Sequence, residues 1–200
     1  MVRIIFVKSL LSDIASISAG HPFRGSIPET ADGDVRVVQI RDVDEYGQID
    51  WQNLIATNIT GRKQPDFLQQ GDILFSARGQ RNIAALVDKQ TPNTVCAPHY
   101  FIIRVTSDVI APAFLAWQLN QLPAQKYFAK SSQGTAVASI PRSFVTETPL
   151  TIPALEQQQL IMAMAAAHLK EKLTLQAMIT NRDLQMQGIA ADLLTSSRKD

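Results

Sequence analysis

The residues best suited to chemistry lie in the short polar segment 78–82, which reads Arg-Gly-Gln-Arg-Asn. Arginine side chains make paired hydrogen bonds with guanine, and glutamine or asparagine side chains make them with adenine. Arg78, Gln80, Arg81 and Asn82 are therefore candidates for contacts with the edges of DNA bases. A polar hairpin loop that binds nothing would have the same composition, so both interpretations stay open.

A second group of basic and small polar residues could contact DNA, because such side chains supply most phosphate contacts in protein–DNA interfaces. Its members are Lys126, Lys130, Ser132, Gln133, Arg62, Lys63, Arg41 and Arg24. Arg62 and Lys63 follow a glycine, so a solvated turn is an equal alternative for this pair.

Charge is unevenly distributed along the chain, although the net charge is only +1. Residues 60–146 hold nine lysines and arginines against four acids, and residues 109–146 hold no acid. A positive segment of this kind attracts phosphates. Chance clustering on a solvated face would produce the same imbalance, so charge alone does not decide between the two.

The elements that must position these residues fit one domain followed by an appendage, as 200 residues with 46% hydrophobic content allow. We predict an α+β domain over residues 1–150, a long helix over 151–195 and a frayed tail over 196–200. Within the domain, apolar and β-branched runs predict strands, and longer apolar patterns opened by proline or closed by it predict helices. The predicted strands are 35–41, 72–76, 100–105 and 136–140, and the predicted helices are 112–122 and 124–130.

Residues 154–194 contain no proline and one glycine, which predicts a single helix of ~60 Å at ~1.5 Å per residue. Two apolar lines follow this segment, so the helix would contact more than one surface. The candidate contact residues are Leu155, Met162, Ala166, Leu169, Leu173, Leu175, Met178, Ile179, Leu184, Met186, Ile189 and Leu193. A helix that folds back onto its own domain is the alternative.

No catalytic or metal-binding motif is recognisable. A DNA methyltransferase would need a glycine-bearing cofactor loop and an Asn/Asp-Pro-Pro-aromatic motif, and the sequence has neither. Cys96 is the only cysteine, and His21, His99 and His168 lack ligand spacing, so we expect no disulfide and no metal site. Because no catalytic motif is recognisable, we expect a protein that is not an enzyme. No apolar run reaches the ~20 residues of a membrane span and no export signal is recognisable, so we also expect a cytoplasmic protein.

Six short phrases, in this order, resemble the specificity subunits of type I restriction–modification systems. They are residues 11–15 with Gly20, 38–43, 71–74 (Gly-Asp-Ile-Leu), 114–120, 133–137 (Gln-Gly-Thr-Ala-Val) and 152–158 (Ile-Pro-Ala-Leu-Glu-Gln-Gln). Each phrase is weak alone, and the order of all six carries the resemblance. One departure is Ala154, where the family often repeats proline.

The resemblance implies a target recognition domain that reads one half of a bipartite DNA site, followed by a spacer helix that pairs antiparallel with a partner helix. It implies methyltransferase subunits as direct partners and a restriction and translocase subunit as an indirect one. S-adenosylmethionine and adenine-N6 chemistry would belong to the methyltransferase, so this chain would need no cofactor.

A complete specificity subunit has two recognition domains and two helices, whereas this sequence has one of each. Three explanations would fit this difference. The chain would be a half-subunit that forms a homodimer, a fragment of a longer protein, or a single-domain member of a related defence system. A homodimer would read a palindromic site, with a spacer set by the helix length. Rival interpretations are a free-standing DNA-binding regulator that dimerises through the helix, and a scaffold without a DNA role.

Overall fold

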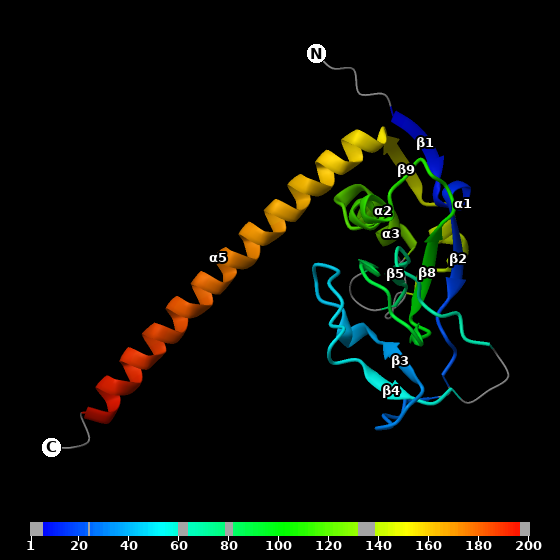
Figure 1. Ribbon diagram of the computed structural model, residues 1–200. Coiled ribbons are helices and arrows are strands. Elements are labelled where there is room, and N and C mark those ends of the chain that lie inside the picture. The colour runs from blue at the N-terminus through cyan, green and yellow to red at the C-terminus, as the bar shows by residue number, and fades with distance from the viewer. Residues whose placement is uncertain (1–5, 24, 60–63, 79–81, 132–138, 197–200) are drawn as a thin grey trace, which may run out of the picture. The chain divides into compact units, whose positions relative to one another are not determined.

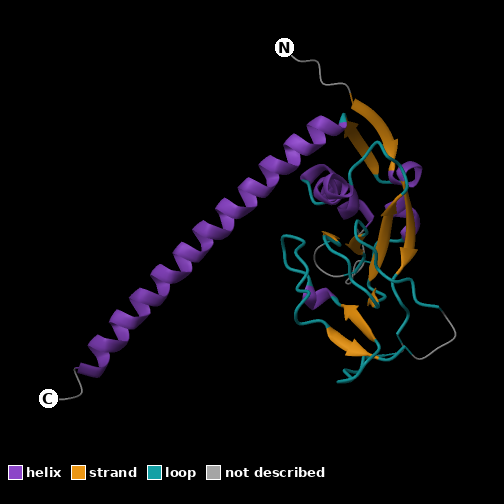
Figure 2. Cartoon of the chain, in the orientation of Figure 1, coloured by secondary structure: helices purple, strands orange, loops and turns teal. Residues whose placement is uncertain are grey.

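The computed structural model describes residues 6–23, 25–59, 64–78, 82–131 and 139–196. The chain divides into two compact units, residues 1–158 and residues 159–200. Unit 1 contains all the described strands and the short helices, and unit 2 consists of the long helix that begins in unit 1 (Figures 1 and 2). The predicted α+β class with a long C-terminal helix is confirmed.

The elements follow the chain in an order that alternates short strands with short helices before the long one. They are β1 (Phe6–Leu10), α1 (Leu11–Ile14), β2 (Ala15–Ala19), β3 (Val35–Val38), the 3-10 helix η1 (Ile40–Asp42), β4 (Ile55–Thr57), β5 (Ile73–Ser76), β6 (Ala84–Leu86), β7 (Thr94–Cys96), β8 (Tyr100–Val105), α2 (Pro112–Leu119), α3 (Leu122–Ser131), α4 (Arg142–Thr146), β9 (Pro149–Pro153) and α5 (Leu155–Ser196).

A four-stranded antiparallel sheet with the order β2-β8-β5-β6 forms the centre of unit 1. Strand β5 is buried along its whole length, because it has a neighbour on each side and both of its faces are covered. On one face, the ring of Phe75 contacts the ring of Phe128 from α3, with centroids 4.7 Å apart. Helix α3 is thereby fixed to the strand that leads into the candidate base-contacting segment.

The other face of β5 joins a core shared with the three-stranded sheet β4-β3-β7, in which β3 and β7 run parallel. Leu74 of β5, Val38 of β3, Cys96 of β7 and Ile102 of β8 belong to one buried cluster. Because both sheets contribute side chains to this cluster, it packs the two sheets against each other.

The Gly-Asp-Ile-Leu phrase begins β5 with a turn and an ion pair. Gly71 has a φ of 94°, a backbone conformation that favours glycine. The Asp72 carboxylate is buried and accepts two hydrogen bonds from Arg104 of β8, from Nε and Nη2, both at 2.7 Å. The same carboxylate accepts the backbone N–H of Gln69 at 2.8 Å, which closes the turn.

Residues 35–41 are predicted to form one strand, but the strand in the structure, β3, ends at Val38. The Asp42 carboxylate accepts the backbone N–H of Gln39 at 2.8 Å, and this bond turns the chain into η1. Burial raises the pKa of Asp42 above its ordinary value. Arg41 therefore projects from a short helical turn rather than from a strand.

A buried glutamine fixes the beginning of α5 within unit 1. The side chain of Gln158 is fully buried, and its Oε1 accepts the backbone N–H of Ala111 at 2.8 Å. Its Nε2 donates to the carbonyls of Val109 and Pro153, both at 2.8 Å. The sequence predicts that the long helix begins at residue 151, but β9 extends to Pro153, which lies opposite Phe6, and α5 begins at Leu155.

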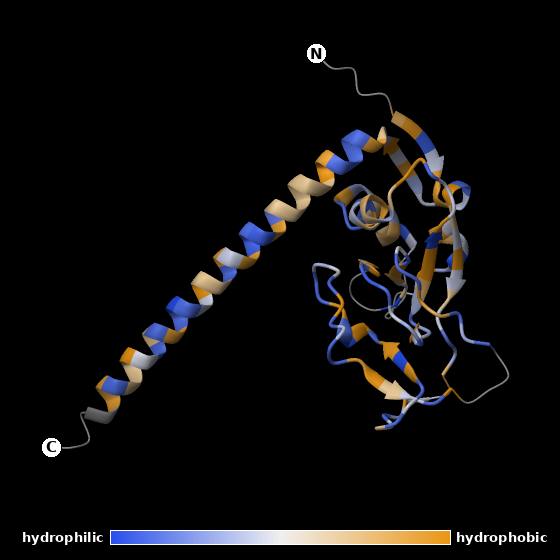
Figure 3. Cartoon of the chain, viewed as in Figure 1, coloured by the Kyte–Doolittle hydropathy of each residue, from blue (hydrophilic) through white to orange (hydrophobic). Residues whose placement is uncertain are grey.

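Unit 2 exposes many large apolar side chains. Figure 3 shows hydrophobic residues recurring along α5 among hydrophilic ones. Leu175, Met178, Ile189 and Leu193 are each more than half exposed. In the part of the chain that the structure describes, no helix is long and apolar enough to cross a membrane.

Candidate nucleic-acid interface

The predicted base-contacting segment leaves the central sheet at the end of β5, beside the beginning of β8. The backbone N–H of Ala77 donates to the carbonyl of His99 at 3.0 Å, and the N–H of Ile140 donates to the carbonyl of Ala77 at 2.9 Å. Arg78 and Ser139 then form an isolated antiparallel bridge. Three segments that are distant in sequence therefore meet at Arg78.

The segment returns to the sheet at Asn82, and the structure gives this residue a role in closing the loop. The Asn82 side-chain Nδ2 donates to the carbonyl of Ser76 at 2.9 Å, and Gln125 of α3 donates to the carbonyl of Asn82 at 2.8 Å. Asn82 is also only partly exposed. Its amide holds the two ends of the loop together, whereas Arg78 is exposed beside the bridge.

Helix α3 adds two lysines to the same region. Ala124 and Phe128 are buried, whereas Lys126 and Lys130 are exposed and four residues apart, so they share one face of the helix. Helix α3 ends at Ser131, and the chain returns from the following segment at Ser139, which pairs with Arg78. The contact that joins α3 to this region is the hydrogen bond from Gln125 of α3 to the carbonyl of Asn82, at 2.8 Å.

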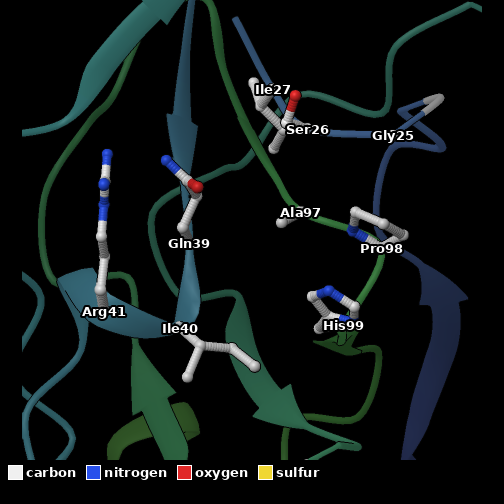
Figure 4. A pocket seen from close by; sticks show the side chains of 9 residues that line it. All are labelled: Gly25, Ser26, Ile27, Gln39, Ile40, Arg41, Ala97, Pro98 and His99. Carbon is white, nitrogen blue, oxygen red and sulfur yellow. The ribbon is translucent and has the colours of Figure 1, made fainter. Parts of the chain in front are cut away.

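A pocket of about 290 Å³ lies beside this region. Its lining residues are Gly25, Ser26, Ile27, Gln39, Ile40, Arg41, Ala97, Pro98 and His99 (Figure 4). His99 connects the pocket to the interface, because its carbonyl accepts the backbone N–H of Ala77. Arg41 borders the pocket from η1 and is 66% exposed, with its Nε 3.7 Å from the carboxylate of Asp42.

Sequence reasoning predicted Arg41 but missed three other polar pocket residues, Ser26, Gln39 and His99. No spacing connects Gln39 and His99 in the sequence. They approach each other because the adjacent strands β3 and β7 are parallel and the chain passes from β7 through Ala97 to His99. Only the pairing of the strands could have shown this.

Arg104 belongs to the positive middle segment, and the count of charges implies that it is free to bind a ligand. The structure shows that it is paired within unit 1 instead. Arg104 hydrogen bonds to Asp72 and lies 3.4 Å from a carboxylate oxygen of Asp66. The hydrogen bond to Asp72 and the nearby carboxylates raise the pKa of Arg104 above its ordinary value. Its charge is neutralised inside unit 1, so Arg78, Lys126 and Lys130 carry the positive charge of the described interface.

Several predicted DNA-contacting residues lie outside the described residues. They are Arg24, Arg62, Lys63, Gln80, Arg81, Ser132 and Gln133. Their roles stay predictions.

The predicted contact residues of the long helix all lie on α5. Most of them are exposed, and Met162 and Leu169 are half-buried. Among the described residues, no group of three or more histidine, cysteine or acidic side chains could hold a metal ion.

A family model for the type I restriction modification DNA specificity domain matches residues 6–182. The chain therefore belongs to this family, as its sequence phrases predict. The match covers the interface, the pocket and most of α5. No curated protein matches the chain.

Solved structures of specificity subunits share this fold. The HsdS subunit from Thermoanaerobacter tengcongensis is 19% identical, with a TM-score of 0.62 over 83% of this chain and 42% of that chain. The type I restriction-modification S subunit from M. genitalium is 16% identical, with a TM-score of 0.54 over 82% of this chain and 39% of that chain. A chain from a structure described as the basis of complex assembly and conformational transition of the type I R-M system is 17% identical, with a TM-score of 0.64 over 86% and 44%. This chain thus spans less than half the length of these proteins.

Proposed function

We propose that this chain reads one half of a bipartite double-stranded DNA target and directs an adenine-N6 methyltransferase, and through it a restriction subunit, to that target. The observation that carries the proposal is the bridge between Arg78 and Ser139, near α3, whose Gln125 donates a hydrogen bond to the carbonyl of Asn82. Membership of the DNA specificity family supports it. In this proposal the chain acts in the cytoplasm and has no catalytic role.

The division of labour within the interface follows from the chemistry of its side chains. Lys126 and Lys130 present point charges on a regular helix face, which suits contacts with phosphates. Arg78 stands at the end of a rigid buried strand, where a planar guanidinium can be aimed at a base edge. Arg41 and His99 at the pocket extend the same polar surface.

Replacing Arg78 by alanine should reduce binding at one base position of the target by ~1–3 kcal/mol while leaving other positions unchanged. Binding of the reconstituted methyltransferase complex to a library of targets that differ at single positions measures this. Lys89→Ala is the matched control, because Lys89 lies beyond the far end of β6, over the ring of Trp51. An equal loss on every sequence would assign Arg78 to a phosphate instead.

Replacing both Lys126 and Lys130 by glutamine should weaken binding equally on all sequences. Each lost phosphate contact should lower the slope of log affinity against log salt by ~0.9, so the double variant should lose about 2. Titrations at several salt concentrations measure the slope, with Lys89→Gln as the control. A slope equal to that of the unmodified protein would show that these lysines do not contact DNA.

The proposed partners explain how an inert chain can affect methylation. Two copies of the chain would pair through α5 and present two recognition domains, and the methyltransferase subunits would bring S-adenosylmethionine. Mapping methylated adenines in cells that express the chain with its methyltransferase tests this. A palindromic, interrupted methylated site supports the proposal, and unchanged methylation without the chain contradicts it.

A further inference from the structure

The pocket beside the candidate interface lies where two neighbouring parallel strands end. Strands β3 and β7 pair with Val38 opposite Cys96, and residues 39–41 and 97–99 come directly after them. These two stretches form two walls of the pocket, and residues 25–27 form the third. In open α/β sheets, ligands bind in crevices beyond the carboxyl ends of parallel strands. The pair β3 and β7 offers the same kind of crevice on a smaller scale.

The walls of the pocket are held in place by contacts within unit 1. The backbone N–H of Ala97 donates to the carbonyl of Val38 at 2.9 Å, which joins the first two walls. The carbonyl of Gln39 accepts the hydroxyl of Tyr100 at 3.4 Å. Ile27, in the third wall, packs against the buried cluster that contains Ala97. The pocket is therefore preformed, so a ligand that enters it has little of the protein left to order.

The lining combines apolar surface with hydrogen-bond donors. Ile27 is half-buried, Pro98 is exposed, and Ile40 is 41% exposed, so apolar surface is left uncovered. Arg41 and His99 are exposed at the same pocket, and none of the described residues that line it is acidic. A simple anion would leave the apolar side chains uncovered, and a purely apolar molecule would cover polar ones without bonding to them. A ligand with a flat apolar face, a polar edge and a negative charge matches the whole lining.

Gln39 supplies a donor for the polar edge of such a ligand. Its Nε2 is buried and has no hydrogen-bond partner among the residues that the structure describes. Figure 4 shows Gln39 and Arg41 on one side of the pocket and Pro98 and His99 on the other. The terminal torsion of a glutamine side chain is soft, so the amide can turn toward a ligand. Purines and thymine present acceptors on their edges, and bonding to one would satisfy this donor.

We propose that the pocket binds one nucleotide, with the face of its base on His99, the edge of its base at Gln39 and its phosphate at Arg41. Histidine rings are among the side chains on which bases stack. The volume of about 290 Å³ suits one small ligand and not a longer stretch of a polymer.

The nucleotide could come from two sources that present the same base and phosphate. One is a free mononucleotide, and the other is a nucleotide whose base has left the stack of bound DNA. The carbonyl of His99 accepts the N–H of Ala77, the residue before Arg78, so the pocket adjoins the candidate interface. The site goes beyond the proposed function, which requires contacts with paired bases only, and only the DNA source rests on that function.

Calorimetric titration of the full-length chain with AMP tests the free source. AMP should bind at least about 10-fold more tightly than inorganic phosphate, because the base adds stacking and an edge contact. Gln39→Leu and His99→Ala should each weaken AMP binding about 10-fold. Both variants keep the backbone bonds of these residues, so the fold should be retained. Gln48→Leu is the matched control, because Gln48 is exposed and does not line the pocket.

Two short DNA duplexes that differ at one bulged position test the DNA source. One carries an unpaired adenine there, and the other carries an abasic sugar with the same phosphates. An unpaired base leaves the stack at the lowest cost, so the chain should bind the adenine duplex about 10-fold more tightly. Gln39→Leu should remove this preference, and Gln48→Leu should retain it.

The outcomes separate the two sources and the two proposals. AMP binding that depends on Gln39 supports the pocket with a free nucleotide, and a preference for the bulged adenine without AMP binding supports it with DNA. AMP binding no tighter than that of phosphate, together with equal binding of the two duplexes, would overturn the pocket and leave target reading at Arg78 intact. Loss of target reading in the single-position library would contradict the proposed function and leave AMP binding unaffected.

Discussion

Replacing Asp72 by alanine should lower the free energy of unfolding by about 3–5 kcal/mol, because it leaves the guanidinium of Arg104 without its main partner. The carboxylate is 1% exposed and receives both 2.7 Å hydrogen bonds from Arg104 as well as the 2.8 Å bond from the backbone of Gln69. The variant retains the longer 3.4 Å contacts of Arg104 with the Asp66 carboxylate and with the carbonyl of Phe67. Urea denaturation of the purified chain measures the change.

Two further variants separate the ion pair from the rest of the site. Asp108 is exposed, so Asp108→Ala should change stability by no more than ~0.5 kcal/mol. Asp72→Ala combined with Arg104→Met should be more stable than Asp72→Ala alone, because it removes the uncompensated charge. If the double variant is less stable than the single one, then the cost of Asp72→Ala comes from the turn at Gln69 and not from the ion pair.

The sequence predicted the strand that carries Arg104 and the phrase that contains Asp72, but it could not predict that these two residues form an ion pair. The strand over residues 100–105 was predicted with the bounds that the structure has, and the Gly-Asp-Ile-Leu phrase was correctly placed at the beginning of a strand. Local patterns suffice for both. That Arg104 faces Asp72 depends on the antiparallel pairing of β8 with β5, and a count of basic residues could not reveal it.

In the candidate interface too, the sequence predicted individual segments but not which of them lie together. Residue types alone suggested the loop at Arg78 and the helix face of Lys126 and Lys130. Their convergence depends on a bridge between Arg78 and Ser139, 61 positions apart, and on the contact of Phe75 with Phe128. Asn82 was predicted by type as a base reader, yet its amide bonds to Ser76 within the loop. Residue type shows what a side chain can bind and not which partner it has.

The sequence predicted the long helix more completely than it predicted the domain before it. Continuous helix formation depends on local composition, and residues 154–194 lack proline. Its start depends on tertiary contacts, because Pro153 pairs within a sheet and Gln158 bonds to the loop at Ala111. Gln158, the final glutamine of the 152–158 phrase, thus joins the first turn of α5 to the loop before α2 and to the end of β9.

Replacing Gln158 by leucine should therefore lower the free energy of unfolding of unit 1 by about 3 kcal/mol. Leucine fills the same space but leaves the N–H of Ala111 and the carbonyls of Val109 and Pro153 without their partner. The carbonyl of Pro153 is buried, and a buried unsatisfied group costs ~1–3 kcal/mol, whereas the two part-buried groups cost less. Gln159→Leu, at an exposed position, should change stability little.

Amide hydrogen exchange at Ala111 gives this prediction a local readout. The N–H of Ala111 donates to Gln158, so it should exchange slowly in the unmodified chain and much faster in Gln158→Leu. In the proposed dimer, pairing of the helices should be unchanged, because the exposed apolar residues of α5 from Leu160 onward lie beyond the substituted side chain. Unchanged exchange at Ala111 would contradict the anchoring role of Gln158, and loss of the dimer would mean that helix pairing depends on how the helix starts in unit 1.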